Sequence, residues 1–187
     1  MKMGSLEEFK KLSVSEQIRE GEDSLLAHIL EKGIEARSQH SDLSMENLDA
    51  FLGDENCLRY PTRFVYEFGA DMSAHQMAQP EEDFRSSVPG AKVVYLRPVL
   101  RKRPDLALAA FLYMIPLINY GEIVRDEHCL VYAASVLGLS EDECYALLCE
   151  AAEYSGSEEK YQSETSQNDP AAMPVSSCGG SCGGCCS

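Results

Sequence analysis

Positive charge is scarce in this sequence. Its 187 residues include 16 Lys and Arg against 31 Asp and Glu, which gives a formal net charge of -15 at pH 7. A surface of this charge repels the phosphates of nucleic acids and of anionic membranes. We therefore expect no nucleic-acid partner, and a cation or a basic protein fits the charge better.

Long apolar runs and a secretory signal are also missing. No run approaches the roughly 20 apolar residues of a membrane span, and the segment 1–12 (MKMGSLEEFKKL) is too charged for a signal peptide. We therefore expect a cytoplasmic protein without a membrane span. Thiols stay mostly reduced in the cytoplasm, so a cysteine cluster there favours metal binding, redox chemistry or modification over structural disulfides.

Known catalytic motifs are absent as well. The sequence contains no glycine-rich phosphate loop, no HExxH and no nucleophile elbow. A catalytic Cys and His that meet only in the folded chain would leave no such motif, so that pairing stays open. We expect a protein that is not an enzyme.

The sequence does have the composition of an ordinary globular domain, with 44% hydrophobic and 25% charged residues. Its length allows one domain and a tail. Hydrophobic periodicity predicts a mainly α fold, a small helical bundle, over residues 1–155, with a two-stranded β ribbon at about 60–100. The expected helices cover 13–37, 45–52, 106–119, 124–137 and 141–154, and the expected strands cover 62–68 and 91–96.

Local signals mark several helix starts. Ser13 with Glu16, and Ser140 with Glu143, have the spacing of capping boxes, and Ser44 is placed to cap the short second helix. The segment 106–119 is apolar on nearly all sides, which predicts a helix covered by others in the middle of the domain. Between the two strands, a polar connection over 69–90 is long enough to hold one or two helical turns around 72–78.

Residues 111–152 contain two turn motifs, Asn119-Tyr-Gly-Glu-Ile-Val-Arg-Asp-Glu127 and Leu137-Gly-Leu-Ser-Glu-Asp-Glu143. This order of helix, GxI turn, helix, LGLS turn and helix resembles the TerB-like helical domains of tellurite resistance. The resemblance implies an all-α bundle, and some of these domains bind metal through acids at the first turn. The family's usual Ala-Asp-Gly is replaced here by Asn119-Tyr120-Gly121, so the resemblance implies the fold rather than a metal at that turn.

The last part of the sequence changes character. Residues 156–177 are rich in Ser, Glu, Gln, Asn and Pro, which predicts a disordered linker. The tail 178–187 (CGGSCGGCCS) then contains four of the eight cysteines, Cys178, Cys182, Cys185 and Cys186. Glycines between soft thiolate donors allow several sulfurs to reach one ion, so we expect Zn or Cu(I) bound there, with an affinity that falls as the pH falls.

Other interpretations of the tail stay open. A Cys, Ser and Gly run behind a folded leader resembles the core peptides of thiazole- and oxazole-modified natural products, although only Cys185 directly follows a glycine. The end Cys185-Cys186-Ser187 resembles that of prenylated small GTPases, but no polybasic stretch lies beside it. The third alternative is that the tail only reflects compositional bias and has no chemical role, while the helical domain recognises a protein partner.

Within the domain, Glu67, Asp71 and His75 would share one helix face and could hold a divalent ion, provided the segment is helical; a solvated loop is the alternative. Cys57 is the one further candidate for an exposed thiol. The acids of Asp126-Glu127-His128-Cys129 are explained as favourable charge at a helix start, and at most one or two of the four side chains could share a site. Cys129, Cys144 and Cys149 are expected to be small core residues. A solvated basic loop or a docking site is the interpretation of Arg97, Arg101, Lys102 and Arg103.

Overall fold

Helices make up most of the described chain, which comprises residue 10, residues 13–73 and residues 76–167 of a computed structural model. The prediction of a mainly α protein is confirmed. In chain order the elements are α2 (Val14–Gln39), α3 (Leu48–Leu52), β1 (Thr62–Val65), β2 (Ala78–Glu82), β3 (Lys92–Leu96), the 3-10 turn η1 (Pro98–Lys102), α4 (Pro104–Tyr120), the 3-10 turn η2 (Gly121–Ile123), α5 (Asp126–Leu137) and α6 (Glu141–Gln167).

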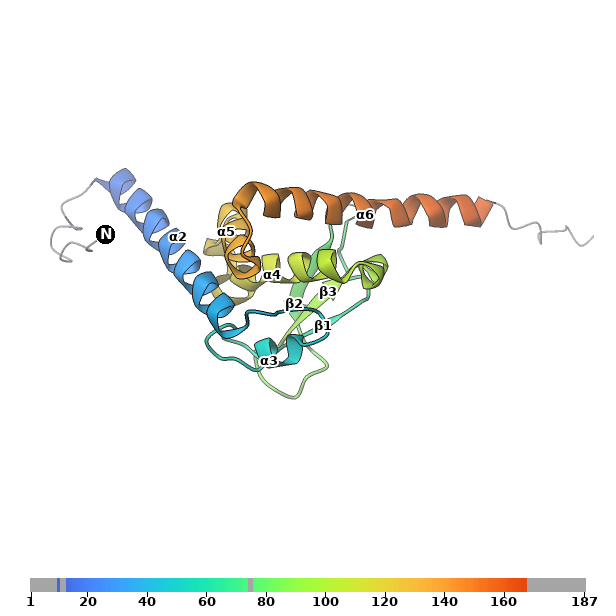
Figure 1. Cartoon of the computed structure of the whole chain (residues 1–187), viewed down its shortest axis with the longest axis horizontal. Coiled ribbons are helices and arrows are strands. Elements are labelled where there is room, and N and C mark those ends of the chain that lie inside the picture. The colour runs from blue at the N-terminus through green and yellow to red at the C-terminus, as the bar shows by residue number, and fades with distance from the viewer. Residues whose placement is uncertain (1–9, 11–12, 74–75, 168–187) are drawn as a thin grey trace, which may run out of the picture.

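Helix α4 lies at the centre of the molecule (Figure 1). It begins with Pro104, a residue suited to the first turn of a helix, and it packs against α5, α6, β2 and β3. Its buried residues include Phe111, which is fully inaccessible. By length and composition alone the segment Pro104–Ile123 could cross a membrane, but 67% of its apolar window is buried inside the protein, as in the core helix of a folded domain.

The predicted capping boxes are both present. At the start of α2, the Ser13 amide donates to Glu16 Oε2 over 2.8 Å, and the Glu16 amide donates to Ser13 Oγ over 3.4 Å. At the start of α6, the Ser140 amide and the Glu143 carboxylate make the corresponding bond over 2.9 Å. The prediction that Ser44 caps α3 is wrong. Asn47 is the residue that precedes α3, and the Asn47 side chain accepts a hydrogen bond from the Ser44 amide.

Helix α6 continues beyond the expected end at 154. Its backbone is helical as far as Gln167, so the first part of the predicted disordered linker 156–177 belongs to a helix. Glu, Lys and Gln in this segment are compatible with a helix, and the first proline of the segment comes only at Pro170. The remainder of the linker, and the whole of the tail 178–187, lie outside the described residues.

The sheet has three strands rather than the two of the predicted ribbon. The expected strands β1 and β3 pair in parallel, with Phe64 opposite Val94, and β2 pairs antiparallel with β3, with Pro80 opposite the same Val94. The strand order is therefore β1-β3-β2. Strand β2 lies in the middle of the connection 69–90 and begins at Ala78, where the expected helical turns around 72–78 would have ended. Because β2 is an edge strand, the missing amide of Pro80 costs the sheet little.

One ion pair crosses the sheet. Arg63 on β1 and Glu81 on β2 both lie opposite Val93 of the middle strand. Arg63 holds Asp83, just past the end of β2, through two bonds, Nε to Oδ2 over 2.5 Å and Nη2 to Oδ1 over 3.0 Å. The guanidinium lowers the pKa of the Asp83 carboxyl. The two outer strands are therefore linked by side chains as well as through β3.

The basic run after β3 is partly solvated and partly structural. Arg101 and Lys102 are exposed, as expected of a solvated loop. Arg97 is buried; its guanidinium donates to the backbone oxygens of Gln76 and Ser73 and lies 4.8 Å from the centre of the Phe68 ring. Arg103 pairs with Asp105 and Glu150, each over 2.7 Å. These two cations stabilise the loop before β2 and the contact of α4 with α6.

Candidate functional site

A group of three potential ligands lies where α2 and α3 meet: His40, Asp54 and Cys57. His40 follows α2 directly, and its amide donates to the oxygen of Ala36 to end the helix. The imidazole packs edge-on against Phe51 of α3, with the ring centres 5.4 Å apart. Because Phe51 is fully buried, the core fixes the direction in which the His40 ring points.

Asp54 and Cys57 belong to one turn after α3. The Cys57 amide donates to the Asp54 oxygen over 3.0 Å, and the Asn56 amide donates to Asp54 Oδ1 over 2.9 Å. One carboxylate oxygen of Asp54 thus holds the turn. The other oxygen, Oδ2, is directed to His40 and Cys57.

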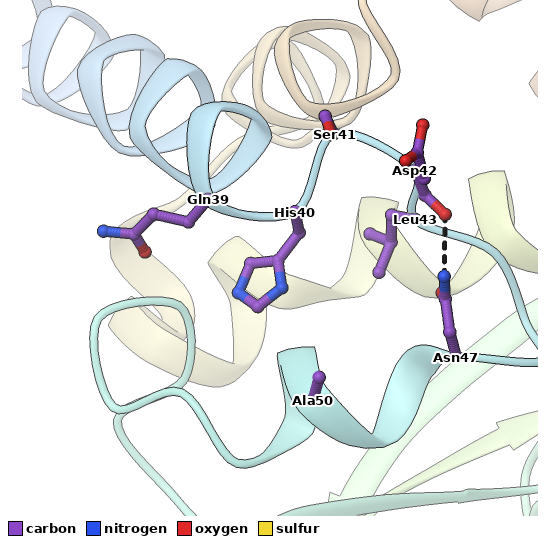
Figure 2. A pocket seen from close by; sticks show the side chains of 7 residues that line it. All are labelled: Gln39, His40, Ser41, Asp42, Leu43, Asn47 and Ala50. Atoms are coloured by element: carbon purple, nitrogen blue, oxygen red, sulfur yellow. Dashed lines mark hydrogen bonds between the residues drawn. The ribbon is translucent and has the colours of Figure 1, made fainter.

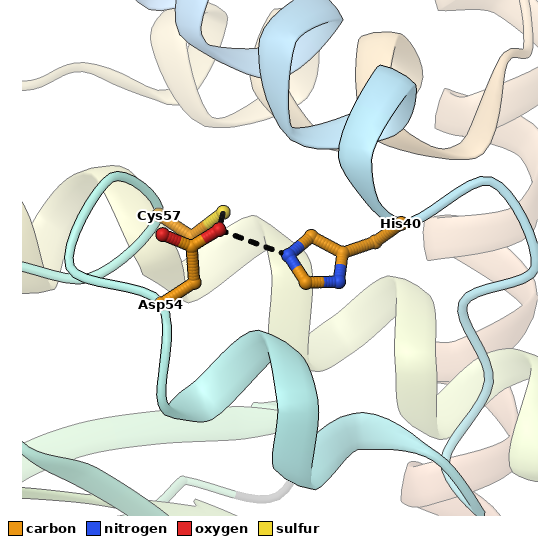
Figure 3. A group of neighbouring side chains, drawn as sticks. All are labelled: His40, Asp54 and Cys57. Atoms are coloured by element: carbon orange, nitrogen blue, oxygen red, sulfur yellow. Dashed lines mark hydrogen bonds and ion pairs between the residues drawn. The ribbon is translucent and has the colours of Figure 1, made fainter.

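Figure 3 shows the three side chains converging from these two segments. His40 Nε2 lies 3.1 Å from Asp54 Oδ2, and Cys57 Sγ donates to the same oxygen over 3.7 Å. The nitrogen, oxygen and sulfur atoms all lie within 4.8 Å of one another. The His40 and Asp54 side chains are 15% and 18% exposed, so solvent reaches the cluster on one side, while Cys57 is buried.

Hydrogen bonds keep Asp54 charged, and burial keeps Cys57 protonated. The Asn56 amide and then the His40 ring lower the pKa of the Asp54 carboxyl. Burial, followed by the charge of Asp54, raises the pKa of Cys57 to about 12. The base hydrogen-bonded to the Cys57 sulfur is the Asp54 carboxylate. Its lowered pKa and the raised pKa of the thiol disfavour transfer of the thiol proton to it. The arrangement therefore favours a ligand set over an activated nucleophile.

The cluster is attached to helix α4. Asn119, near the end of α4, donates to the Cys57 oxygen over 2.8 Å and accepts from the Arg59 amide over 2.9 Å. Tyr132 of α5 is buried. Its hydroxyl has no hydrogen-bond partner among the described residues. Burial raises the pKa of Tyr132, and electrostatic interactions with Cys57, Tyr120 and Asp54 raise it further.

A polar pocket of about 240 Å³ opens beside the cluster. Figure 2 shows the residues that line it, with the Asn47 side chain bonded to the Asp42 oxygen over 2.8 Å. His40 belongs both to this pocket and to the cluster. The imidazole therefore lies between the pocket and Asp54.

The predicted site residues are not brought together among the described residues. Cys178, Cys182, Cys185, Cys186 and His75 all lie outside them. Glu67 and Asp71 are exposed, and the chain between them forms bends and turns, so the helical face on which a site with His75 depended is not present. Gly69 lies between these two acids, and a Cβ atom at this position would be 3.0 Å from Glu81 Oε1 and 3.1 Å from Gln79 Oε1.

The residues of the segment 126–129 have separate partners. Asp126 accepts from the Tyr113 hydroxyl over 3.0 Å, and His128 accepts from the Arg125 amide over 3.0 Å as part of the α5 cap. Cys129 and Cys144 are buried core residues, as predicted; Cys149 is only partly buried. The prediction of an exposed Cys57 is wrong, because the turn after α3 directs its thiol inward.

Sequence reasoning missed the cluster itself. The turn Asp54-Glu55-Asn56-Cys57 was a readable signal, since an Asp that caps a tight turn and a Cys three residues later lie on the same side. His40 gave no such signal, because it is fourteen residues from Asp54 and reaches it only after α3 has folded back. Comparisons with protein-family models, curated proteins and solved structures find no match for this chain.

Proposed function

We propose that this chain is a non-catalytic cytoplasmic accessory protein that binds a soft metal ion, or delivers it to a partner, through Cys178, Cys182, Cys185 and Cys186. The observation that carries the proposal is four thiols within nine residues, separated by glycine and serine. Thiolates select Zn²⁺ or Cu(I) over hard cations. A compact cluster without histidine suits a transfer site better than a structural site, which joins separated pairs of ligands.

The helical domain supplies the protein-binding part of this proposal. Large apolar side chains stand exposed on α2, among them Val14 and Ile18. The TerB-like resemblance is compatible with the described elements, because the segment 111–152 contains parts of α4 and α6 and all of α5, with Gly121 and Gly138 at positive φ in the turns. A domain of this kind would position the tail against the protein that receives the ion.

A second candidate function is that of a precursor whose tail is modified by partner enzymes. The specific observation in its favour is the composition of residues 178–187, which contain only Cys, Gly and Ser. Enzymes that form thiazoles and oxazoles cyclise these side chains onto the preceding carbonyl. Each ring formed this way loses water and hydrogen, so the two functions predict different masses.

The experiment combines an intact mass with a metal titration. Full-length protein from its native host should have the mass of the unmodified sequence. Under anaerobic reducing conditions it should bind about one additional Zn²⁺ or Cu(I) relative to a chain in which Cys178, Cys182, Cys185 and Cys186 are changed to Ser, because four thiolates complete one tetrahedral site.

The outcomes separate the candidates. A mass deficit at the tail identifies a modified precursor and rejects metal delivery as the main function. An unmodified mass together with equal metal binding by the two chains rejects the metal proposal and leaves a helical interaction domain. Titration of a chain with Ser at Cys129 and Cys144 controls for adventitious binding by buried thiols.

A further inference from the structure

We propose that His40, Asp54 and Cys57 form a second metal site, inside the folded domain, that takes Zn²⁺ and acts independently of the tail cysteines. The inference does not rest on the function proposed for the tail. It rests on the geometry and charge of three side chains.

The spacing of the donor atoms fits a tetrahedral ion. Zinc bonds of about 2.0–2.3 Å place neighbouring ligand atoms about 3.3–3.8 Å apart. The structure has 3.1 Å between His40 Nε2 and Asp54 Oδ2, and 3.7 Å between Asp54 Oδ2 and Cys57 Sγ. All three atoms lie within 4.8 Å of one another, so small side-chain rotations are enough to receive an ion.

The donor set also selects the kind of ion. An imidazole nitrogen, a carboxylate oxygen and a thiolate sulfur are the three ligand types that Zn²⁺ uses in proteins, whereas Ca²⁺ and Mg²⁺ require oxygen ligands. When the zinc–sulfur bond forms, the S–H bond of Cys57 breaks and its proton passes to solvent. The two charges of Zn²⁺ are then balanced by one carboxylate and one thiolate, which suits a site where Cys57 is only 3% exposed.

The test uses the full-length chain with Ser at Cys178, Cys182, Cys185 and Cys186, so that every remaining thiol belongs to the domain. This tail-silenced chain is titrated with Co²⁺, which reports a sulfur ligand through its thiolate-to-metal absorption band, and then with Zn²⁺ in competition. We expect about one Co²⁺ per chain with a thiolate band, because one ion can take all three donors.

Three variants in the tail-silenced background decide the assignment. Cys57→Ser should abolish the thiolate band, and Asp54→Asn and His40→Gln should each weaken Zn²⁺ binding by at least about 10-fold. Cys129→Ser is the matched control, because Cys129 is also a buried thiol whose pKa is raised to about 12, and it should leave the band unchanged. Far-UV circular dichroism without metal shows which variants fold.

The proposal is overturned if the tail-silenced chain gives no thiolate band, or if the band survives Cys57→Ser. Should Cys57→Ser fail to fold, Asp54→Asn decides: unchanged Zn²⁺ affinity in a folded Asp54→Asn chain also rejects the site. Loss of the tail metal in the earlier experiment has no bearing on this result, since the tail thiols are absent from every chain used here.

Discussion

Asp83 shows at the scale of a single residue how a charge contributes to this fold. Its carboxylate accepts hydrogen bonds from two nitrogens of the Arg63 guanidinium and, over 3.1 Å, from the Arg85 amide. Paired planar groups of this kind make stronger bonds than single neutral ones. The pair connects β1 to the end of β2 across the middle strand.

Asp83→Asn should therefore lower the urea midpoint of unfolding at pH 7, and the deficit should disappear in acid. The pKa of Asp83 is lower in the folded chain than in the unfolded one, so its stabilisation is complete above the unfolded value of about 3.9 and is lost as the pH falls through the folded value. Midpoints from pH 7 down to pH 3 measure this. Asp71→Asn, at an exposed turn position, is the control; parallel acid profiles for Asp83→Asn and the parent chain would contradict the expectation.

Single residues also set the limit of sequence reasoning at the site. Cys129 and Cys144 were predicted correctly, because each lies on a helix among apolar neighbours. Cys57 and Arg97 were not, since a loop position before Arg59 indicated an exposed Cys57 and a cluster of basic residues indicated a solvated Arg97. Their burial depends on partners far along the chain: Asn119 for the turn of Cys57, and Gln76 and Ser73 for Arg97.

At the scale of elements, the contact of α2 with α5 depends on a glycine. A Cβ atom at Gly33 would lie 2.6 Å from the Cβ of Ser135 and 3.2 Å from the backbone oxygen of Tyr132. Both atoms belong to α5 and cannot rotate away. The two helices therefore approach as closely as they do only because position 33 has no side chain.

Gly33→Ala and Gly21→Ala should change stability in opposite directions. Overpacking at Gly33 costs about 1–3 kcal/mol, which exceeds the gain of about 0.5–1 kcal/mol from replacing a helical glycine. A Cβ atom at Gly21 would have no other group within 4 Å, so Gly21→Ala should show the gain alone. Thermal unfolding of both variants measures the difference; equal shifts of the same sign would show that α2 and α5 are not in close contact.

Helices proved more predictable than strands. Capping boxes and helical periodicity depend on residues three or four positions apart, and both boxes lie where they were expected. Strand β2 (AQPEE) has neither strand-forming residues nor alternation, and its proline argues against a strand. It pairs because β3 offers a free edge, which no local pattern reveals. The extra length of α6 was missed because its polar composition is equally typical of a linker.

At the scale of the whole molecule, stability depends on α4. Phe111 is fully buried in the core and meets Phe64 of β1 edge-on, with ring centres 6.0 Å apart. It therefore touches the sheet from the helix that α5 and α6 also cover. This side chain adds a contact with β1 to the packing of α4 against β2 and β3.

Phe111→Ala should cost about 3–5 kcal/mol of the free energy of unfolding, from lost burial and the cavity left behind. Phe84 is the matched control, because its side chain is 91% exposed, and Phe84→Ala should change stability by no more than about 0.5 kcal/mol. Chemical denaturation followed by circular dichroism gives both values. A cost below about 1 kcal/mol for Phe111→Ala would contradict the packing of α4 against the sheet.

Helix α2 has a further consequence for how the molecule moves. Its buried residues, Ile29, Gly33 and Ala36, all lie in its second half. In the first half the partly buried Leu25 packs against the core, and Glu22 pairs with Arg125. Segments with little buried area open without the rest of the protein. Backbone amides near Val14 should exchange with solvent through local fraying, whereas those near Ala36 exchange only when the core opens. His40 lies at the protected end, so motion of the free end of α2 leaves the cluster undisturbed.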